Sequence, residues 1–553
     1  IPMARTSADG QNNSKLDSFL KRNTSRDVYE RIRVSEPCVV VSGSVKKVFM
    51  HVILSDECVY LSEYHPRALR EALSFRHITS IELINDLPDF LSGQDRERSL
   101  HIRVVYTTKN AGEKSERTKG SSKMTESPSR AYNSAEEEEE EEESVIPKRR
   151  SASCPNPVVP HLFNSSPASP LPNISNTEHR WRKSPEAFSH RGSVLSRAIR
   201  RATTTDKQKG EEKEEELHLY AVSPSSRIFL HLQSSWSSYI IRSTLMLDPV
   251  YMKKCGLSSS SPKKPINHKI SWERTCQLFS QLSGELLQEN ISLESLYLLL
   301  QELRTATYRN PTIKKLFWRF LCNSCCFCLF FLQQYEDKDN VSVSCRLCTV
   351  VVQILSLMFR ETEIEPKRLS MLTAKKGDTT ANMLLALVCD PDLQLPDTTN
   401  DTKSSINKLQ SLQADYLDAA SALLFEVVVL CQEASRTPAL GHFLTIGWVF
   451  RLLKPHPFLL PFVGYQAQQT VLVLSGPQFP ISPSQAVLLY QRCCVLLACL
   501  QHSPCLSKYI RTGFKEEFRS FMNLEDKLPD HYPISQPAQR LLSQLLSVVL
   551  ERP

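Results

Sequence analysis

Residues 38–64 read CVVVSGSVKKVFMHVILSDECVYLSEY, and this stretch decides the fold of the first part of the chain. It contains three short apolar runs separated by turn residues, at 38–43, 48–55 and 57–64. Runs of this length that are rich in β-branched residues are typical of β-strands. The second run alternates, as a strand with one buried face does, and its apolar positions are Val48, Met50, Val52 and Leu54. The stretch therefore predicts antiparallel strands joined by tight turns.

The same pattern continues on both sides of a long interruption. Further strands are expected at 74–85, 100–107, 217–223 and 227–233. A helix at 234–247 follows, in which Trp236 shares a face with Ile240 and Leu245. We therefore expect one small β domain in two parts, 36–108 and 217–248, with Trp236 as the aromatic anchor of its capping helix. Such a split permits folding because the entropy cost of closing a loop grows only logarithmically with its length.

Seven strands followed by one amphipathic helix resemble a pleckstrin-homology (PH) domain, and the stretches ITSIEL (78–83) and LHLYAVSPSSRIFLHL (217–232) look similar to it too. The resemblance implies a binding fold without built-in chemistry, whose lipid-binding members grip phosphates with Lys and Arg at the first hairpin. Lys46 and Lys47 stand there in this chain and are the candidate ligand-binding residues. The Lys-x-Arg pattern of strong phosphoinositide binders is absent, so a weak contact with an anionic membrane surface, or with a peptide, is expected. Another small antiparallel β domain with a terminal helix is the alternative fold.

The interruption, residues 109–216, is rich in Ser, Pro and charged residues and is expected to be disordered. Eight consecutive Glu at 136–143 precede a basic half. The sequence RSASCP (150–155) matches the pattern R-S-x-S-x-P that 14-3-3 adaptor proteins recognise when the second Ser is phosphorylated. The residues that carry this hypothesis are Arg150, Ser151, Ser153 and Pro155. Thr203, which follows Arg200-Arg201, is a second phosphorylation candidate.

From residue 270 to 553 the apolar period changes to that of α-helices. Helices are expected at 271–289, 292–308, 312–335, 341–361, 379–389, 405–434, 439–453, 458–474, 483–501, 506–523 and 535–551. Several are apolar on more than one face, which favours an irregular stacked array similar to armadillo or HEAT repeats. Residues 249–269 form the linker before this α-helical domain, and residues 1–35 form an N-terminal tail with a helix at 15–34.

The 17 cysteines do not indicate a metal site. Cys322-x-x-Cys325 and Cys345-x-x-Cys348 have zinc-ribbon spacing, but each pair lies in an apolar helical run and not in a turn. We therefore expect buried free thiols, no metal and no cofactor. Residues 316–332 contain Arg319 and Asn323 and are short for a membrane span, so no transmembrane segment is expected. With no apolar leader at the start, a cytoplasmic location is expected, and a nuclear one is the alternative.

These features predict a non-enzymatic scaffold or adaptor. Its PH-like module would dock on a membrane surface or peptide, its helical domain would bind a protein partner, and phosphorylation of the insert would regulate it. The alternatives are an enzyme regulator or a nuclear factor that associates with nucleic acid. Motifs of Ser hydrolases, zinc proteases and P-loop enzymes are absent from the sequence, and a net charge of +7 is small for a nucleic-acid binder of this length.

As a whole, the chain resembles an uncharacterised vertebrate family named for an open reading frame on human chromosome twelve. The resemblance is carried by the opening SKLDSFLKRNTSRDVYERIRVSEPCVVV (14–41), the Glu run and the helical tail. It implies no activity and assigns no functional residue.

Overall fold

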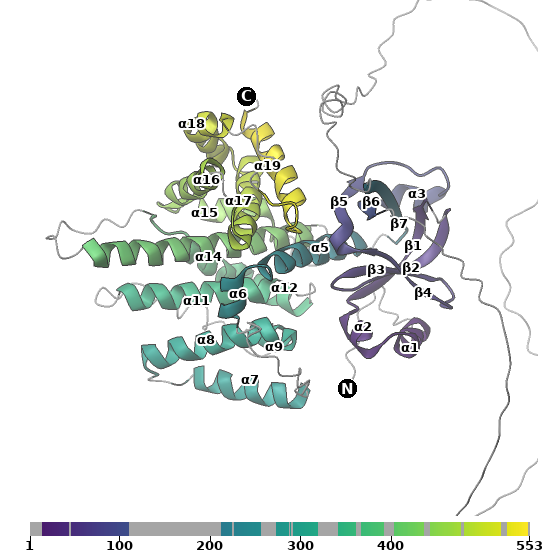
Figure 1. Ribbon diagram of the computed structural model, residues 1–553, viewed down its shortest axis with the longest axis horizontal. Helices are drawn as coiled ribbons and strands as arrows, with labels where there is room; N and C mark the ends of the chain where they lie inside the picture. Colours follow the sequence, from purple (N-terminus) through teal and green to yellow (C-terminus); the bar gives the residue numbers. More distant parts are fainter. Residues whose placement is uncertain are drawn as a thin grey trace, which may run out of the picture. The chain divides into compact units, whose positions relative to one another are not determined.

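The structure is a computed structural model, shown in Figure 1. It describes residues 14–43, 46–109, 212–223, 226–255, 272–286, 288, 291–318, 341–360, 366–391, 403–435, 443–476, 480–520 and 528–550. Within these ranges a β region comes first along the chain and a helical region follows. Most of residues 109–216, which carry the phosphorylation and 14-3-3 predictions, lie outside the described residues.

The β region is one antiparallel sheet with the strand order β4-β3-β2-β1-β7-β6-β5. Its strands are β1 (Val34–Ser42), β2 (Val48–Leu54), β3 (Cys58–Glu63), β4 (Leu69–Ser74), β5 (Ile78–Ile84), β6 (Leu100–Lys109) and β7 (Glu212–Ala221). The last strand pairs with β1 on one side and with β6 on the other. The prediction that residues after the insert complete the sheet begun before it is confirmed. Lys109 of β6 faces Glu212 of β7, so the insert leaves and re-enters the sheet between paired neighbours.

Four expected strands are placed differently by the structure, and the first of them, expected at 38–43, begins at Val34. Residues 227–233 are not a strand but the start of helix α5 (Ile228–Leu245), because a short apolar run fits a buried helix as well as a buried strand. The expected strand 74–85 is divided by the short helix η1 (Phe75–His77) into the end of β4 and the whole of β5. The last strand begins at Glu212, inside the predicted disordered insert, because β6 extends far enough to pair with it.

The N-terminal helix expected at 15–34 is two helices, α1 (Ser14–Asn23) and α2 (Arg26–Arg31). The break falls at Ser25, whose side chain accepts a hydrogen bond from the amide of Val28 and so caps α2. Apolar side chains from α1 pack on the outer face of the sheet in a separate cluster made of Leu16, Phe19, Leu20, Ile32 and Ile53.

Helix α5 belongs to two hydrophobic cores. Its first residues, such as Ile228 and Leu232, lie in the core of the sheet. Its later residues, such as Ile241, lie in the core of the helical region, and Trp236 and Tyr239 pack against both. Glu36 of β1 holds the start of this helix, because its carboxylate accepts hydrogen bonds from the Ser226 hydroxyl and the Arg227 amide. Burial raises the pKa of Glu36.

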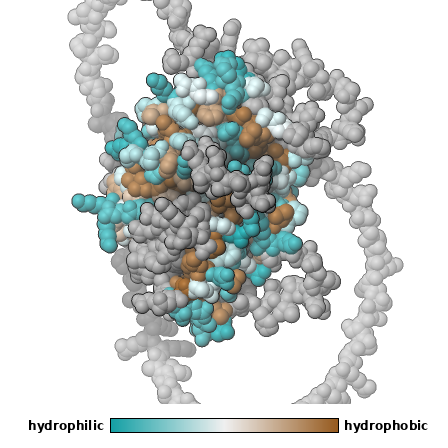
Figure 2. Space-filling view, turned by 90° about the vertical axis from the view of Figure 1, so that its left-hand side faces the viewer, coloured by the Kyte–Doolittle hydropathy of each residue, from teal (hydrophilic) through white to brown (hydrophobic). Residues whose placement is uncertain are grey.

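The helical region confirms the change of period. Its helices are α6 (Pro249–Lys254), α7 (Trp272–Leu286), α8 (Leu293–Arg309), α9 (Pro311–Leu316), α11 (Val341–Phe359), α12 (Pro366–Thr373), α13 (Asp378–Leu387), α14 (Lys403–Ser435), α15 (Ile446–Leu453), α16 (Leu459–Ser475), α17 (Pro483–His502), α18 (Pro504–Arg519) and α19 (Ser535–Leu550). The expected helix 439–453 begins only at Ile446, where Thr445 caps it. Apolar side chains appear on one face of this region in patches broken by polar ones (Figure 2).

Two of these helices are long and apolar enough to cross a membrane. They are the segments Ser342–Phe359 and Pro483–His502, and most of each is buried inside the fold, as in core helices of proteins without membrane spans. Cys345 and Cys348, which were expected to be buried free thiols despite their zinc-ribbon spacing, are buried thiols in α11. Cys322 and Cys325 lie outside the described residues. Among the described residues, no group of three or more His, Cys, Asp or Glu side chains is arranged to hold a metal ion.

Candidate functional site

The two lysines singled out from the sequence lie in the turn between β1 and β2. Lys46 and Lys47 are exposed. Lys47 adopts a left-handed backbone conformation with φ 48°, which is uncommon outside glycine. Its ammonium group lies 5.1 Å from the centre of the Phe90 ring, within the range of a cation–π contact. Lys47 is therefore in contact with Phe90 of the segment between β5 and β6, whereas Lys46 is exposed in the turn.

Next to this turn, the outer face of the sheet carries a line of apolar and aromatic side chains. Val39 of β1 lies between Phe49 of β2 and Tyr220 of β7 in the strand registers. Tyr64, just after β3, continues the line because its ring centre lies 4.9 Å from that of Phe49. We call Tyr64, Phe49, Val39 and Tyr220 the outer-face row.

The β2 end of this row is open to solvent. Phe49 and Tyr64 are 38% and 50% exposed, and Val48, which lies next to them at the start of β2 but on the other face of the strand, is 43% exposed. His51 lies beneath Tyr64, with its ring stacked on the tyrosine at 5.3 Å, and burial lowers its pKa. A solvent-facing cluster of large apolar side chains at a loop end is a common mark of an interaction surface.

Basic side chains surround this open end. The loop between β3 and β4 adds exposed His65 and Arg67 beside Tyr64. Since β2 starts where β3 ends, this loop and the turn of Lys46 and Lys47 meet at one end of the sheet. We call Lys46, Lys47, Val48, Phe49, Tyr64 and Arg67 the hairpin-end surface.

Acidic residues at the start of β7 lie at the same end of the sheet, but two of them are engaged within it. The Tyr106 hydroxyl donates to Glu215 at 3.2 Å. The guanidinium of Arg103 lies 3.6 Å from Glu216. Arg103 thus offsets part of the negative charge of Glu216, whereas the neutral Tyr106 hydroxyl satisfies Glu215 without changing its charge.

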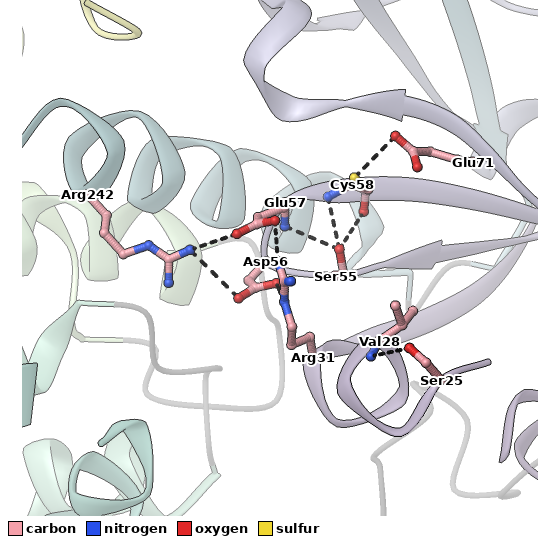
Figure 3. A network of polar contacts seen from close by, with 9 residues as sticks. All are labelled: Ser25, Val28, Arg31, Ser55, Asp56, Glu57, Cys58, Glu71 and Arg242. Atoms are coloured by element: carbon pink, nitrogen blue, oxygen red, sulfur yellow. Dashed lines mark hydrogen bonds and ion pairs between the residues drawn. The ribbon is translucent and has the colours of Figure 1, made fainter. Parts of the chain in front are cut away.

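A second polar cluster ties the N-terminal helices, the β2–β3 turn and α5 together (Figure 3). Arg31 of α2 bonds Asp56 at 2.7 Å and also pairs with Glu57. Arg242 of α5 lies 3.5 Å from Glu57 and 3.8 Å from Asp56. Burial alone would lower the pKa of Arg31. The hydrogen bonds that its guanidinium donates to the carboxylates of Glu57 and Asp56 outweigh this effect and raise the pKa. Two guanidiniums face two carboxylates, so the cluster is neutral and suits a structural role worth at most about 1 kcal/mol per exposed pair.

The helical region contains one further concavity of interest, a groove of about 640 Å³ between α7, α8 and α9. Its floor is apolar, with Phe279, Leu282 and Ile313, and its rim carries Glu285, Glu302 and other polar groups. Its volume is in the range of pockets that take small ligands.

The structure brings together some sequence-predicted residues and separates others. Lys46 and Lys47 lie together in the turn at the hairpin end. Trp236 is not part of that surface, because it lies in α5 and packs against both the sheet core and the helical core. Arg150, Ser151, Ser153, Pro155 and Thr203 lie outside the described residues. Sequence reasoning missed Phe49, Tyr64 and Arg67. A signal for Phe49 was present, because assigning Val48, Met50 and Val52 to one face leaves Phe49 on the other.

Comparison with known proteins places the chain among proteins without an assigned activity. The family model described as "Protein of unknown function (DUF4551)" matches residues 10–145 and 118–548. The chain is similar to "Uncharacterized protein C12orf56" of Homo sapiens, with 33% identity over 97% of this chain and 98% of the human protein. The homologue from Macaca fascicularis is 32% identical over the same shares, and that from Mus musculus is 36% identical over 62% of this chain and 67% of the mouse protein. No solved structure matches the chain.

Proposed function

The chain belongs to the DUF4551 family of proteins of unknown function, and since the family brings no activity with it, we propose a function from the chain's own geometry. The protein is a non-enzymatic adaptor whose β region docks on an anionic membrane surface through the hairpin-end surface. Its helical region holds a protein partner. Phosphorylation of the insert, with Ser153 as the site for a 14-3-3 adaptor, regulates the assembly.

The observation that carries the membrane part is the exposure of Val48, Phe49 and Tyr64 between Lys46, Lys47 and Arg67. Aromatic rings favour the interface between lipid headgroups and chains. Basic residues near an anionic leaflet contribute about 1 kcal/mol each. Three such residues therefore supply about 3 kcal/mol, to which apolar insertion adds.

The architecture supports a PH-like identity for the β region. The seven strands are followed by one helix, and that helix buries apolar side chains in the sheet core. These features match the strand count and capping helix of the family that the sequence resembles. PH-like domains are binding modules, which agrees with an adaptor and not with catalysis by this region.

The helical region supports the partner-binding part. The groove between α7 and α8 has an apolar floor and a charged rim, which is the form that accepts an amphipathic helix of another protein. Leu278 and Leu298 on these helices are 42% and 66% exposed, which leaves apolar area for a partner.

The membrane proposal is tested by sedimenting the full chain with phosphatidylcholine vesicles, with and without phosphatidylserine. We expect binding only to the anionic vesicles. K46E/K47E should weaken it by at least about thirtyfold, since the attraction of two lysines at about 1 kcal/mol each is lost and two repelled negative charges are added. Phe49→Ala with Tyr64→Ala should weaken it as well. The matched control is K253E/K254E, a basic pair exposed at the end of α6, and it should bind as the wild type does.

Two results would overturn the membrane proposal. One is the absence of wild-type binding to anionic vesicles. The other is equal retention of the wild type, K46E/K47E and the aromatic double variant, which would mean that any membrane contact uses a different surface.

A further inference from the structure

Four titratable side chains form a continuous hydrogen-bonded line across the outer face of the sheet. Asp86, in the loop after β5, bonds Nδ1 of His101 at 2.8 Å. Nε2 of His101 lies 2.9 Å from Nδ1 of His218 on β7. Nε2 of His218 in turn lies 3.1 Å from Glu216. His101 is buried and His218 is partly exposed.

Counting protons shows what this line requires. Two carboxylates at its ends accept hydrogen bonds, so His101 Nδ1 and His218 Nε2 must each carry a proton. The two remaining nitrogens face each other at 2.9 Å. If both imidazoles were neutral, two lone pairs would meet there. If both were fully protonated, two N–H groups would meet. All three bonds form together only when the two rings share three protons, with one proton between them.

Charged groups of both signs lie around the pair. The charged groups that face it are Asp86 from the loop, Glu216 from β7, and Arg103 from β6, which also pairs with Glu82 of β5. The Glu82 carboxylate is met by Arg103 and by Arg540 of α19, so Asp86 and Glu216 are the carboxylates that contact the pair directly. From β7 the Tyr220 ring stacks on His101 at 4.2 Å, and β1 presents Val41 opposite His218.

The same loop covers part of the outer-face row. Four residues after Asp86, Phe90 packs edge-on against Tyr220 with ring centres 4.8 Å apart. The ammonium group of Lys47, in the β1–β2 turn, lies over the Phe90 ring, 5.1 Å from its centre. The loop is thus held to the sheet at two points, by the histidine line and by Phe90.

We propose that His101 and His218 form a proton-operated latch that holds segment 85–99, which includes helix α3 (Gly93–Arg98), on the sheet. The latch is closed while the pair carries three protons and loosened when it gains or loses one. Gain or loss of a proton would then expose Tyr220 and release Lys47 next to the hairpin-end surface. The latch goes beyond the proposed function and does not depend on membrane binding, because it acts within the β region alone.

Hydrogen exchange of the full chain tests the latch. Exchange of peptides from 85–99 is compared between wild type and H218Q from about pH 5 to about pH 9, with a chelator present throughout. The ratio of the two rates at each pH cancels the intrinsic pH dependence of exchange. We expect the loop to exchange about fivefold more slowly in the wild type at an intermediate pH, the effect of one net hydrogen bond. The difference should shrink on both the acidic and the alkaline side.

His65→Gln is the matched control, since His65 is exposed on the neighbouring loop and lies outside the line. Its exchange should follow the wild type at every pH. His218 is on the surface of the sheet, so H218Q should fold, and unchanged exchange in the helical region verifies this. A second reading uses ¹⁵N-histidine spectra, in which the wild type should show a hydrogen-bonded proton shared by the two rings that H218Q lacks. Equal exchange profiles for wild type and H218Q, or ordinary independent titration of both rings, would overturn the latch.

Discussion

At the residue scale, Trp236 shows how one side chain serves two cores. It packs against the sheet core and the helical core, yet its indole nitrogen is buried and has no hydrogen-bond partner among the described residues. Trp318 differs, because its indole nitrogen donates to the carbonyl of Met358 at 3.0 Å. The first tryptophan therefore acts through packing, and the second through packing and a hydrogen bond.

This contrast leads to a prediction for urea unfolding of the full chain. Trp236→Ala should lower the free energy of unfolding by about 3 kcal/mol through the cavity left between the cores, while Trp236→Phe should cost about 1 kcal/mol because the ring is retained. Trp318→Phe should cost about 1–2 kcal/mol more than Trp236→Phe, since a buried carbonyl loses its donor. Equal costs for both Phe variants would contradict this account.

The candidate surface shows how far single residues can be predicted. Lys46 and Lys47 were found from the sequence because a hairpin turn is a local feature with a recognisable pattern. Tyr64 and Arg67 were not, because they join the surface only through the pairing of β2 with β3. Cross-strand neighbours depend on register, which the sequence of one strand does not contain.

At the element scale, residues 228–233 show the limit of local patterns. Their apolar side chains are buried whether the segment is a strand or a helix, so the pattern alone favours neither. The helix forms because β7 already pairs with β1, so residues 228–233 are not needed as a further strand there. Their apolar side chains instead cover the core face of the sheet as the start of α5. The pairing of β7 with β6 draws Glu214, Glu215 and Glu216 into β7 despite the low strand preference of Glu.

The β6–β7 pairing also makes a prediction about the insert. Since Lys109 faces Glu212, residues 110–211 can be replaced by Asn-Gly, the preferred turn of a two-residue hairpin. Shortening the loop lowers its closure entropy by about 3 kcal/mol, at about 0.6 kcal/mol per halving of length. The excised protein should therefore unfold cooperatively at a melting temperature equal to or above that of the full chain, as measured by circular dichroism. A lower melting temperature would show that the insert contributes contacts to the folded unit.

At the scale of the whole molecule, the β region and the helical region share α5. A boundary near residue 248 was expected from the sequence, where the capping helix ends and a linker begins. In the structure, Ile240, Ile241 and Leu245 of that helix are buried in the helical core. Further contacts join the two regions, as the amide of Ile534 donates to Thr244 and Arg540 of α19 donates to the carbonyl of Thr79 on β5.

We therefore expect that the β region does not behave as an independent domain. A chain ending at residue 248 would expose Ile240, Ile241 and Leu245, each worth about 1.5–3 kcal/mol when buried. It should elute as oligomers in size-exclusion chromatography with light scattering. Ile241→Glu with Leu245→Glu in the shortened chain should raise the monomer fraction, whereas the same pair in the full chain should destabilise it. A monomeric, well-folded unsubstituted fragment would contradict the shared-helix architecture.

Periodicity in the sequence was enough to determine the β-then-α order, most helices and the faces of β2. These are local properties, because the alternation of Val48, Met50, Val52 and Leu54 and the helical period after residue 270 depend only on neighbours along the chain. Only the tertiary structure decided that 228–233 is helical, that β7 starts at Glu212, and that His101 and His218 meet. Each of these depends on which distant segment lies alongside, and burial and hydrogen bonding between distant segments exist only once the chain has folded.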